Sequence, residues 1–484
     1  MQEKAKETRG LKRSLKARHM NMIAIGGTIG TGIFMGSGAS VSQAGPGGAL
    51  AAYALTGIMI YFIMTSLGEL STHNPVAGSF YTYAARYVDP AFGFSLGWAY
   101  WINWAATIAV ELIASAAAMQ LFLPNVNPSV FIIIFAVIVI GINIFSVRAY
   151  GESEFWFSSI KVAAVSLFII IGIFVILGVG GHSPGVSNWI LADPDKGRAP
   201  FVGGFAGVIS VFMLAGFSFA GTEAVGVAAA ESENPAVNVP RSIRAVLYRI
   251  LIFYFGAIAI IGFLVPFTDP NLANPNNDVF YSPMVIAFNS LGIGWLAYVI
   301  NFVVLTAVLS CTSSCIYAGS RMLYGMAENG AAPKIFLKSN KRRVPIVAVL
   351  STSVIGLFAL VTNYVGKGQV YIWIMDIVGL MVFIVWFGVA VSHIRFRMAF
   401  KAQGKSLDIL RFKALLFPVG PILAALLCLV AIVGQFFLTG LAPADVFLYF
   451  IGLILVIVLF VCYKLIKKSK LVPLKDIDLS PREE

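Results

Sequence analysis

Two glycine-rich segments within long apolar sequence could bind a charged small molecule through the main chain. The first runs from Gly26 to Phe34 and the second from Gly216 to Glu223. Glycine inside a helix costs about 1 kcal/mol relative to alanine, so this density of glycine favours unwinding. Free N–H groups at a break attract a carboxylate, and free C=O groups attract an ammonium. The segments therefore predict a site for an amino acid, which carries both groups; the alternative is close helix packing through the Gly-xxx-Gly spacing of Gly26 and Gly30.

Ionisable side chains inside apolar sequence are the second set of candidates, because each costs about 2.5–3.5 kcal/mol to insert into a membrane. Lys161 could load and release a proton if its ammonium is buried, whereas the alternative is that it extends to the membrane surface. Glu223 directly follows the second glycine-rich segment. It is predicted to act as a gate or proton acceptor, or else to be satisfied by the freed backbone.

Three further acids lie in apolar segments. Glu111 shares one helical face with Trp104 and Thr107, which makes this face a candidate side-chain pocket. Asp376 lies near the outer end of its segment and is an outer-gate charge, a cation contact or a surface residue. Glu69 is expected to be structural and to pair with a loop cation. The excess of deep acids over the single deep lysine favours a cationic substrate.

The composition identifies the class of protein that must position these residues. Of 484 residues, 59% are hydrophobic and only 12% are charged, which excludes a soluble enzyme and indicates a polytopic membrane protein. Twelve apolar segments predict an all-α protein with twelve transmembrane helices, near 19–39, 48–72, 94–120, 129–147, 155–178, 203–228, 247–266, 291–320, 345–362, 371–393, 415–438 and 446–466. The four cysteines fall in these segments and are interpreted as packing residues; no metal site is expected.

The distribution of basic residues predicts the orientation. The two tails and the even-numbered connections hold 30 of the 34 Lys and Arg residues, and the odd-numbered connections hold three. Basic residues accumulate on the cytoplasmic side, so both termini are predicted to be cytoplasmic and the first segment to be a retained helix. The net charge of +12 is attributed to this topology and to lipid contact, not to nucleic-acid binding.

Several motifs carry a resemblance to a known family. The segments Met22–Phe34, Ser42–Gly48 and Phe217–Glu223 resemble the amino acid–polyamine–organocation superfamily, as does Glu69-Leu70. The stretch from Glu231 to Arg241 narrows the resemblance to the amino acid permease family, over about residues 11–468. This resemblance implies a five-plus-five inverted repeat of the leucine-transporter type with helices 1 and 6 interrupted. The expected units are a tail at 1–18, repeats at 19–180 and 203–396, helices 11 and 12 at 414–468, and a tail at 469–484.

The resemblance also implies roles for individual residues. The substrate carboxylate is expected at the backbone of Gly30, Thr31 and Gly32, and the ammonium at carbonyl groups near Thr28, Phe217 and Ala220. Phe217 would cover the substrate as a gate. Lys161 would occupy the place of a sodium ion, couple transport to protons and contact helix 8, with Ser310, Ser313 or Ser314 as partners.

The expected function is therefore proton-coupled import of an amino acid, L-lysine, by alternating access in the cell membrane. The expected partners are the amino acid, H⁺ and membrane lipid, with no cofactor and no enzymatic activity. Permeases for arginine, histidine or a broad neutral set, and an amino-acid sensor without transport, are the alternatives.

Overall fold

The computed structural model describes residues 15–25, 29–76, 78–179, 183–272, 282–292, 294–363, 367–438 and 443–481. The first half contains α2 (Ala17–Ile25), the π-helix η1 (Gly32–Gly36), α3 (Ser37–His73), α4 (Ser79–Tyr87), α5 (Pro90–Gln120), α6 (Pro128–Phe145) and α7 (Val147–Ile176). The connection to the second half contains α8 (Ser187–Ile190) and an antiparallel hairpin of β1 (Ala192–Asp193) and β2 (Gly197–Arg198). Within the described residues, this hairpin forms the only β-sheet, and it departs from the predicted all-α class.

The second half begins with α9 (Gly204–Ser210), α10 (Phe212–Phe219), α11 (Ala224–Ala228) and the 3₁₀-helix η2 (Ala229–Glu231). It continues with α12 (Pro235–Arg249), the π-helix η3 (Ile250–Phe255), α13 (Gly256–Leu264), α14 (Pro283–Ser290) and α15 (Gly294–Glu328). The 3₁₀-helices η4 (Lys334–Leu337) and η5 (Leu357–Asn363) flank α16 (Ile346–Gly356), and α17 (Lys367–Ala402) follows. The chain ends with η6 (Leu407–Ile409), α18 (Val419–Leu438) and α19 (Pro443–Lys467).

The helices agree in position with the twelve predicted segments. Eight helical stretches among the described residues are long and apolar enough to cross a membrane, and three shorter apolar helices correspond to the seventh, ninth and eleventh segments. One long stretch, Gly32–His73, contains the end of the first predicted helix and all of the second. The two are separated by a kink, where the backbone leaves helical geometry at Gly45 before Pro46. At Gly45 the φ angle is +72°, which L side chains rarely adopt, so glycine permits the change of direction between them.

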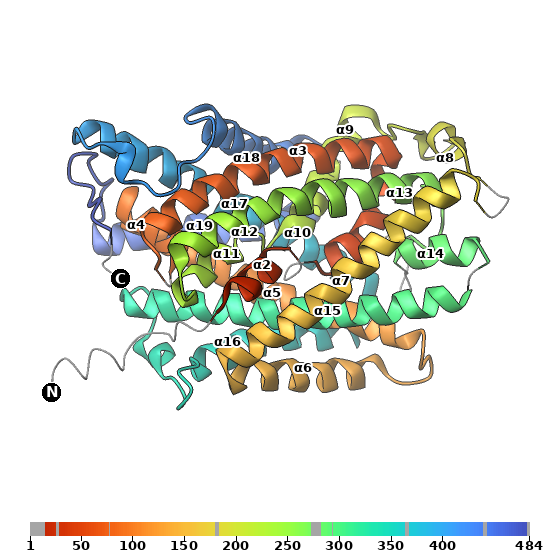
Figure 1. The fold of residues 1–484 in the computed structure, drawn as a ribbon, viewed down its shortest axis with the longest axis horizontal. Helices are drawn as coiled ribbons and strands as arrows, with labels where there is room; N and C mark the ends of the chain where they lie inside the picture. The colour runs from red at the N-terminus through yellow and green to blue at the C-terminus, as the bar shows by residue number, and fades with distance from the viewer. Residues whose placement is uncertain are drawn as a thin grey trace.

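Both tails and the even-numbered connections meet at one end of the helix bundle, here called the basic end. Leu15, in the N-terminal tail, donates its N–H to the carbonyl of Glu231 at the end of the sixth helix, over 3.0 Å. In the C-terminal tail, Val472 donates to the carbonyl of Val88 over 2.8 Å. Figure 1 shows α4 at this end, with α8, α9 and α14 at the opposite end. The predicted grouping of the basic connections on one side is therefore reproduced by tertiary contacts.

The centre of the bundle is formed by α5, which packs along α15 and is buried over most of its length. By contrast, α6, α18 and α19 expose apolar side chains on their outer faces, including Val137 with 66% exposure. In a membrane protein such faces contact lipid, since helices satisfy their own backbone hydrogen bonds. Buried polar side chains in the interior include Thr31, Asn103, Glu111, Lys161, Glu223 and Ser310.

Candidate functional site

The first predicted helix is interrupted where its glycines cluster. Helix α2 ends at Ile25, Ile29 and Gly30 are not helical, and the helix resumes at Thr31 before η1. The residues between, 26–28, lie outside the described residues, so the prediction for Thr28 has no structural description. The first N–H groups of a helix have no partner within it, and they attract negative charge.

The sixth predicted helix is interrupted in the same way. Helix α10 ends at Phe219, Ala220 is extended with a ψ angle of 143°, and α11 begins at Ala224. Gly221 has a φ angle of +85°, in the region that favours glycine. Both predicted interruptions are confirmed within the described residues.

The two interrupted helices contact each other directly beside their breaks. A Cβ atom added at Gly32 would be 2.4 Å from the Cα of Ser218, so the two backbones touch here. Tyr53 and Ser218 share a hydrogen bond of 2.7 Å between their hydroxyls, and Tyr254 donates to the Ser218 carbonyl over 2.7 Å. Phe217, the predicted gate, is buried beside this contact. The glycines thus have both of the predicted effects: the helices unwind next to them, and the two helices also pack closely.

The third helix presents polar atoms that make no hydrogen bond. The hydroxyl of Tyr100, the indole N–H of Trp104 and one carboxylate oxygen of Glu111 are buried without a partner among the described residues. Thr107 differs, because its hydroxyl donates to the carbonyl of Asn103 in the same helix over 2.8 Å. Buried polar groups are almost always paired, and those that are not call for an explanation such as a ligand. Tyr100, Trp104 and Glu111 follow one face of α5, as helical spacing requires.

Glu111 contacts the start of the resumed first helix. Its Oε1 accepts from the Thr31 hydroxyl over 2.9 Å and from the Thr31 N–H over 3.4 Å. A Cβ atom at Gly30 would lie 2.8 Å from the same oxygen, so only glycine leaves room for this carboxylate. The structure therefore places Glu111 at the first interruption.

Glu223 caps the interruption of the sixth helix. The N–H of Gly221 donates to both of its carboxylate oxygens, over 3.1 and 3.2 Å, and the indole N–H of Trp386 donates to Oε2 over 3.1 Å. A backbone N–H freed by the interruption thus provides hydrogen bonds to Glu223, as the second alternative from the sequence predicted. Sequence patterns did not indicate Trp386, which lies on α17, 163 residues away.

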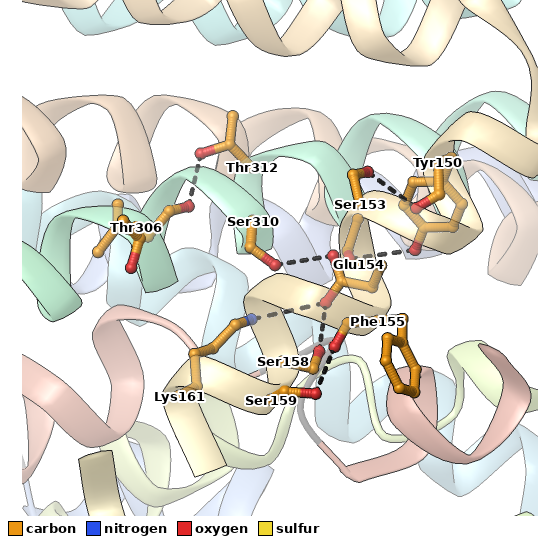
Figure 2. A network of polar contacts seen from close by, with 12 residues as sticks. Tyr150, Ser153, Glu154, Phe155, Ser158, Ser159, Lys161, Thr306, Ser310 and Thr312 are labelled. Atoms are coloured by element: carbon orange, nitrogen blue, oxygen red, sulfur yellow. Dashed lines mark hydrogen bonds and ion pairs between the residues drawn. The ribbon is translucent and has the colours of Figure 1, made fainter. Parts of the chain in front are cut away.

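Lys161 is fully buried, and its nearest described acid is Glu154 on the same helix, with Nζ and Oε1 3.6 Å apart. Ser158 donates to Oε1 of Glu154 over 2.8 Å, and Ser310 on α15 donates to Oε2 over 2.7 Å (Figure 2). Glu154 was not predicted as a partner, although its spacing of seven residues places it on the same helical face as Lys161.

The three serines predicted as helix-8 partners have separate contacts. Ser310 reaches the Lys161–Glu154 pair through the carboxylate. Ser313 accepts a hydrogen bond from the amide of Asn143 over 2.8 Å, and Ser314 pairs with the hydroxyl of Tyr150 at 3.1 Å. Only Ser310 is therefore connected to the buried lysine through a described contact.

A second buried ion pair lies towards the basic end. Glu231 accepts a hydrogen bond from Tyr317 and lies 3.4 Å from Nε of Arg321, whose guanidinium is 4.2 Å from the centre of the Tyr317 ring. Glu231 follows the sixth helix, whereas Tyr317 and Arg321 belong to α15. This cluster joins the end of the interrupted sixth helix to the eighth.

Glu69 pairs with a cation near the basic end, as predicted, but this cation belongs to a helix and not to a loop. Its Oε2 accepts from Nη2 of Arg397 over 2.7 Å and from the N–H of Ala414 over 2.7 Å, and His393 lies 3.2 Å from Oε1. Arg397 lies within α17, which extends beyond the predicted end of the tenth segment.

Replacing Glu69 with alanine is expected to lower the free energy of unfolding by about 3–5 kcal/mol, because the buried Arg397 guanidinium would lose its partner. Thermal unfolding of the purified protein measures this effect. The exposed pair Lys413–Asp408 is the matched control, and its removal is expected to leave stability almost unchanged, because water screens exposed charges. Equal effects of the two changes would contradict the structural role of Glu69.

The remaining candidates are Asp376, possible metal ligands and the cysteines. The backbone of Asp376 lies in α17, but its side chain is outside the described residues. Among the described residues, no group of three or more His, Cys, Asp or Glu side chains is arranged to hold a metal ion. The four cysteines are free thiols, and three of them are buried.

Comparisons with known proteins identify the family of this chain. The family model for amino acid permeases matches residues 19–475. The chain is 47% identical to the lysine-specific permease of Escherichia coli over 97% of this chain and 96% of that protein, and 44% identical to the lysine-specific permease of Lactococcus lactis over 98% and 94%. It is 43% identical to a histidine permease of Lactococcus lactis over 97% of this chain and 98% of that protein. A crystal structure of the Eremococcus coleocola manganese transporter matches with a TM-score of 0.58 and 15% identity, covering 93% of this chain and 94% of that one, which shows the fold alone.

Proposed function

This chain belongs to the amino acid permease family, and on that premise we propose that it imports L-lysine together with protons by alternating access. The observation that carries the proposal is the direct contact of two interrupted helices at Gly32 and Ser218. Backbone dipoles from two broken helices can hold both charged groups of an amino acid at one point. The identity to two lysine-specific permeases and the excess of deep acids support lysine as the amino acid.

The substrate carboxylate is placed at the first interruption, against the backbone of Gly30, Thr31 and Gly32. The ammonium is placed at the second, against the carbonyl groups of Phe217 and Ala220, with Thr28 as a further acceptor. The unpaired Trp104 indole on α5 supports this placement, because a bound amino acid would lie where its N–H finds an acceptor. Thr107 then contributes shape more than hydrogen bonds, since its hydroxyl is bonded within α5.

Proton coupling is assigned to Lys161 and Glu223. A buried lysine changes protonation state readily, and the contact of its partner Glu154 with Ser310 on α15 supports a link between two helices that move relative to each other. Glu223 accepts from the N–H of Gly221, so its charge acts on the peptide group whose Ala220 carbonyl is proposed to hold the ammonium. Phe217 closes the site as a gate.

The remaining assignments concern the membrane. Residues 19–180 and 203–396 are taken as the inverted repeats, with the helices of 414–468 added to them and tails at 1–18 and 469–484. The basic end is placed in the cytoplasm of a cell membrane, because 30 of the 34 Lys and Arg residues belong to the tails and connections that meet there. Asp376 is placed near the outer end of helix 10.

Purified protein in liposomes is expected to accumulate labelled L-lysine when the outside is more acidic than the inside. Accumulation should cease when a protonophore removes the gradient, because the downhill flow of protons drives the uphill flow of lysine. Unlabelled lysine, arginine, histidine and leucine are added in equal excess to measure competition. Stronger inhibition by arginine, histidine or leucine than by lysine would assign a different amino acid to the site, and binding without uptake would favour a sensor.

A further inference from the structure

Glu111 occupies the main-chain position at which the substrate carboxylate is proposed to bind. Its Oε1 accepts from both the hydroxyl and the N–H of Thr31, at 2.9 and 3.4 Å. Its Oε2 is buried and makes no hydrogen bond with the residues that the structure describes, and the side chain as a whole is 1% exposed. The carboxylate is therefore held by the helix start through one oxygen only, in a position where water does not solvate the other.

Two carboxylates cannot share this position while both are charged. Like charges within hydrogen-bonding range of one donor disfavour each other, so one must leave or take up a proton. The start of a helix stabilises an anion, and that stabilisation passes to whichever carboxylate is bound. This reasoning rests on the proposed function, since it requires an amino acid whose carboxylate approaches Thr31.

We propose that Glu111 is a built-in competitor of the substrate: it holds Thr31 in the empty transporter and releases it when an amino acid binds. Release occurs when the carboxylate takes up H⁺ that enters from the bulk solution as the amino acid binds, because a neutral carboxyl group is no longer attracted by the helix start. The titratable groups that act on Glu111 from neighbouring helices are Lys161 on α7 and Cys311 and Cys315 on α15. Glu111 is thus a specificity-determining residue for the α-carboxylate, not for the side chain of the substrate.

This assignment differs from the side-chain pocket predicted from sequence in what it expects of different ligands. L-lysine carries the α-carboxylate and the side-chain ammonium, norleucine lacks the ammonium, and cadaverine lacks the carboxylate. If Glu111 competes with the substrate carboxylate, its removal changes the affinity for lysine and norleucine alike and leaves the affinity for cadaverine unchanged. A contact to the side-chain ammonium affects lysine and cadaverine and leaves norleucine unchanged.

The test compares the wild-type protein with Glu111→Gln at pH 8, where binding of each ligand is measured by calorimetry on the full chain. The variant is expected to bind lysine and norleucine about fivefold more tightly, with no gain for cadaverine, because the anion that competes for the helix start is absent.

A second variant, Thr31→Val, keeps the N–H for the substrate but removes the hydroxyl that holds Glu111, so it should change affinity in the same direction. Weaker binding of lysine with unchanged binding of norleucine in Glu111→Gln would overturn the proposal in favour of a side-chain contact. Unchanged binding of all three ligands would also overturn it. If the wild-type protein binds another amino acid and not lysine, the proposed substrate fails, and the same comparison with that amino acid still tests Glu111.

Discussion

Replacing Lys161 with alanine is expected to reduce uphill accumulation of lysine to background while the protein still inserts into the membrane. The buried ammonium is the group to which proton coupling is assigned, and no proton can be exchanged at an alanine. Exchange of labelled for unlabelled lysine across the membrane needs no net proton movement, so it is expected to persist in the variant. Proteoliposomes with and without a pH gradient separate the two activities.

The same substitution carries a stability cost that requires a control. Without the ammonium, Glu154 is a buried charge with only serine donors, and breaking a buried pair costs about 3–5 kcal/mol. The double variant Lys161→Met/Glu154→Gln removes both charges, so it is expected to regain most of that stability without regaining uphill accumulation. Uphill accumulation at the wild-type level in either variant would remove the coupling assignment from Lys161.

Replacing Gly32 with alanine is expected to weaken lysine binding by at least about tenfold and to lower stability by about 1–3 kcal/mol or more. The added Cβ would lie 2.4 Å from the Cα of Ser218, a backbone atom that cannot rotate away. The two interruptions would have to separate, and the positions assigned to the carboxylate and the ammonium would separate with them. Calorimetric binding and thermal unfolding of the purified variant measure the two effects.

Gly141→Ala is the matched control, because it also adds one methyl group to a transmembrane helix. A Cβ atom at Gly141 on α6 meets nothing within 4 Å, and this face of α6 is exposed. Binding is expected to be unchanged, with a small gain in stability from the higher helix propensity of alanine. Equal binding by Gly32→Ala and the wild-type protein would show that the contact with Ser218 does not define the site.

The fold was predictable because its determinants are local or compositional. Apolar length identifies the membrane helices, and the counts of Lys and Arg predict which connections share a side. The interruptions at Gly30 and Gly221 were predictable for the same reason, since backbone preference belongs to each glycine and its neighbours. The ends of the helices were less predictable: α17 continues to Ala402, past its last long apolar run, and in this extension Arg397 pairs with Glu69.

The partners of the buried charges were decided by the tertiary structure alone. Glu111 was predicted from its helical face but not its contact with Thr31, 80 residues away, and Trp386 was not predicted to reach Glu223. Which side chains meet between two helices depends on their rotation and depth relative to each other, and periodicity within one helix does not specify either. The residue types, their spacing and the breaks in the helices are thus properties of the sequence. The pairing of each acid with its donor is a property of the packed bundle, because only packing brings distant segments within hydrogen-bonding distance.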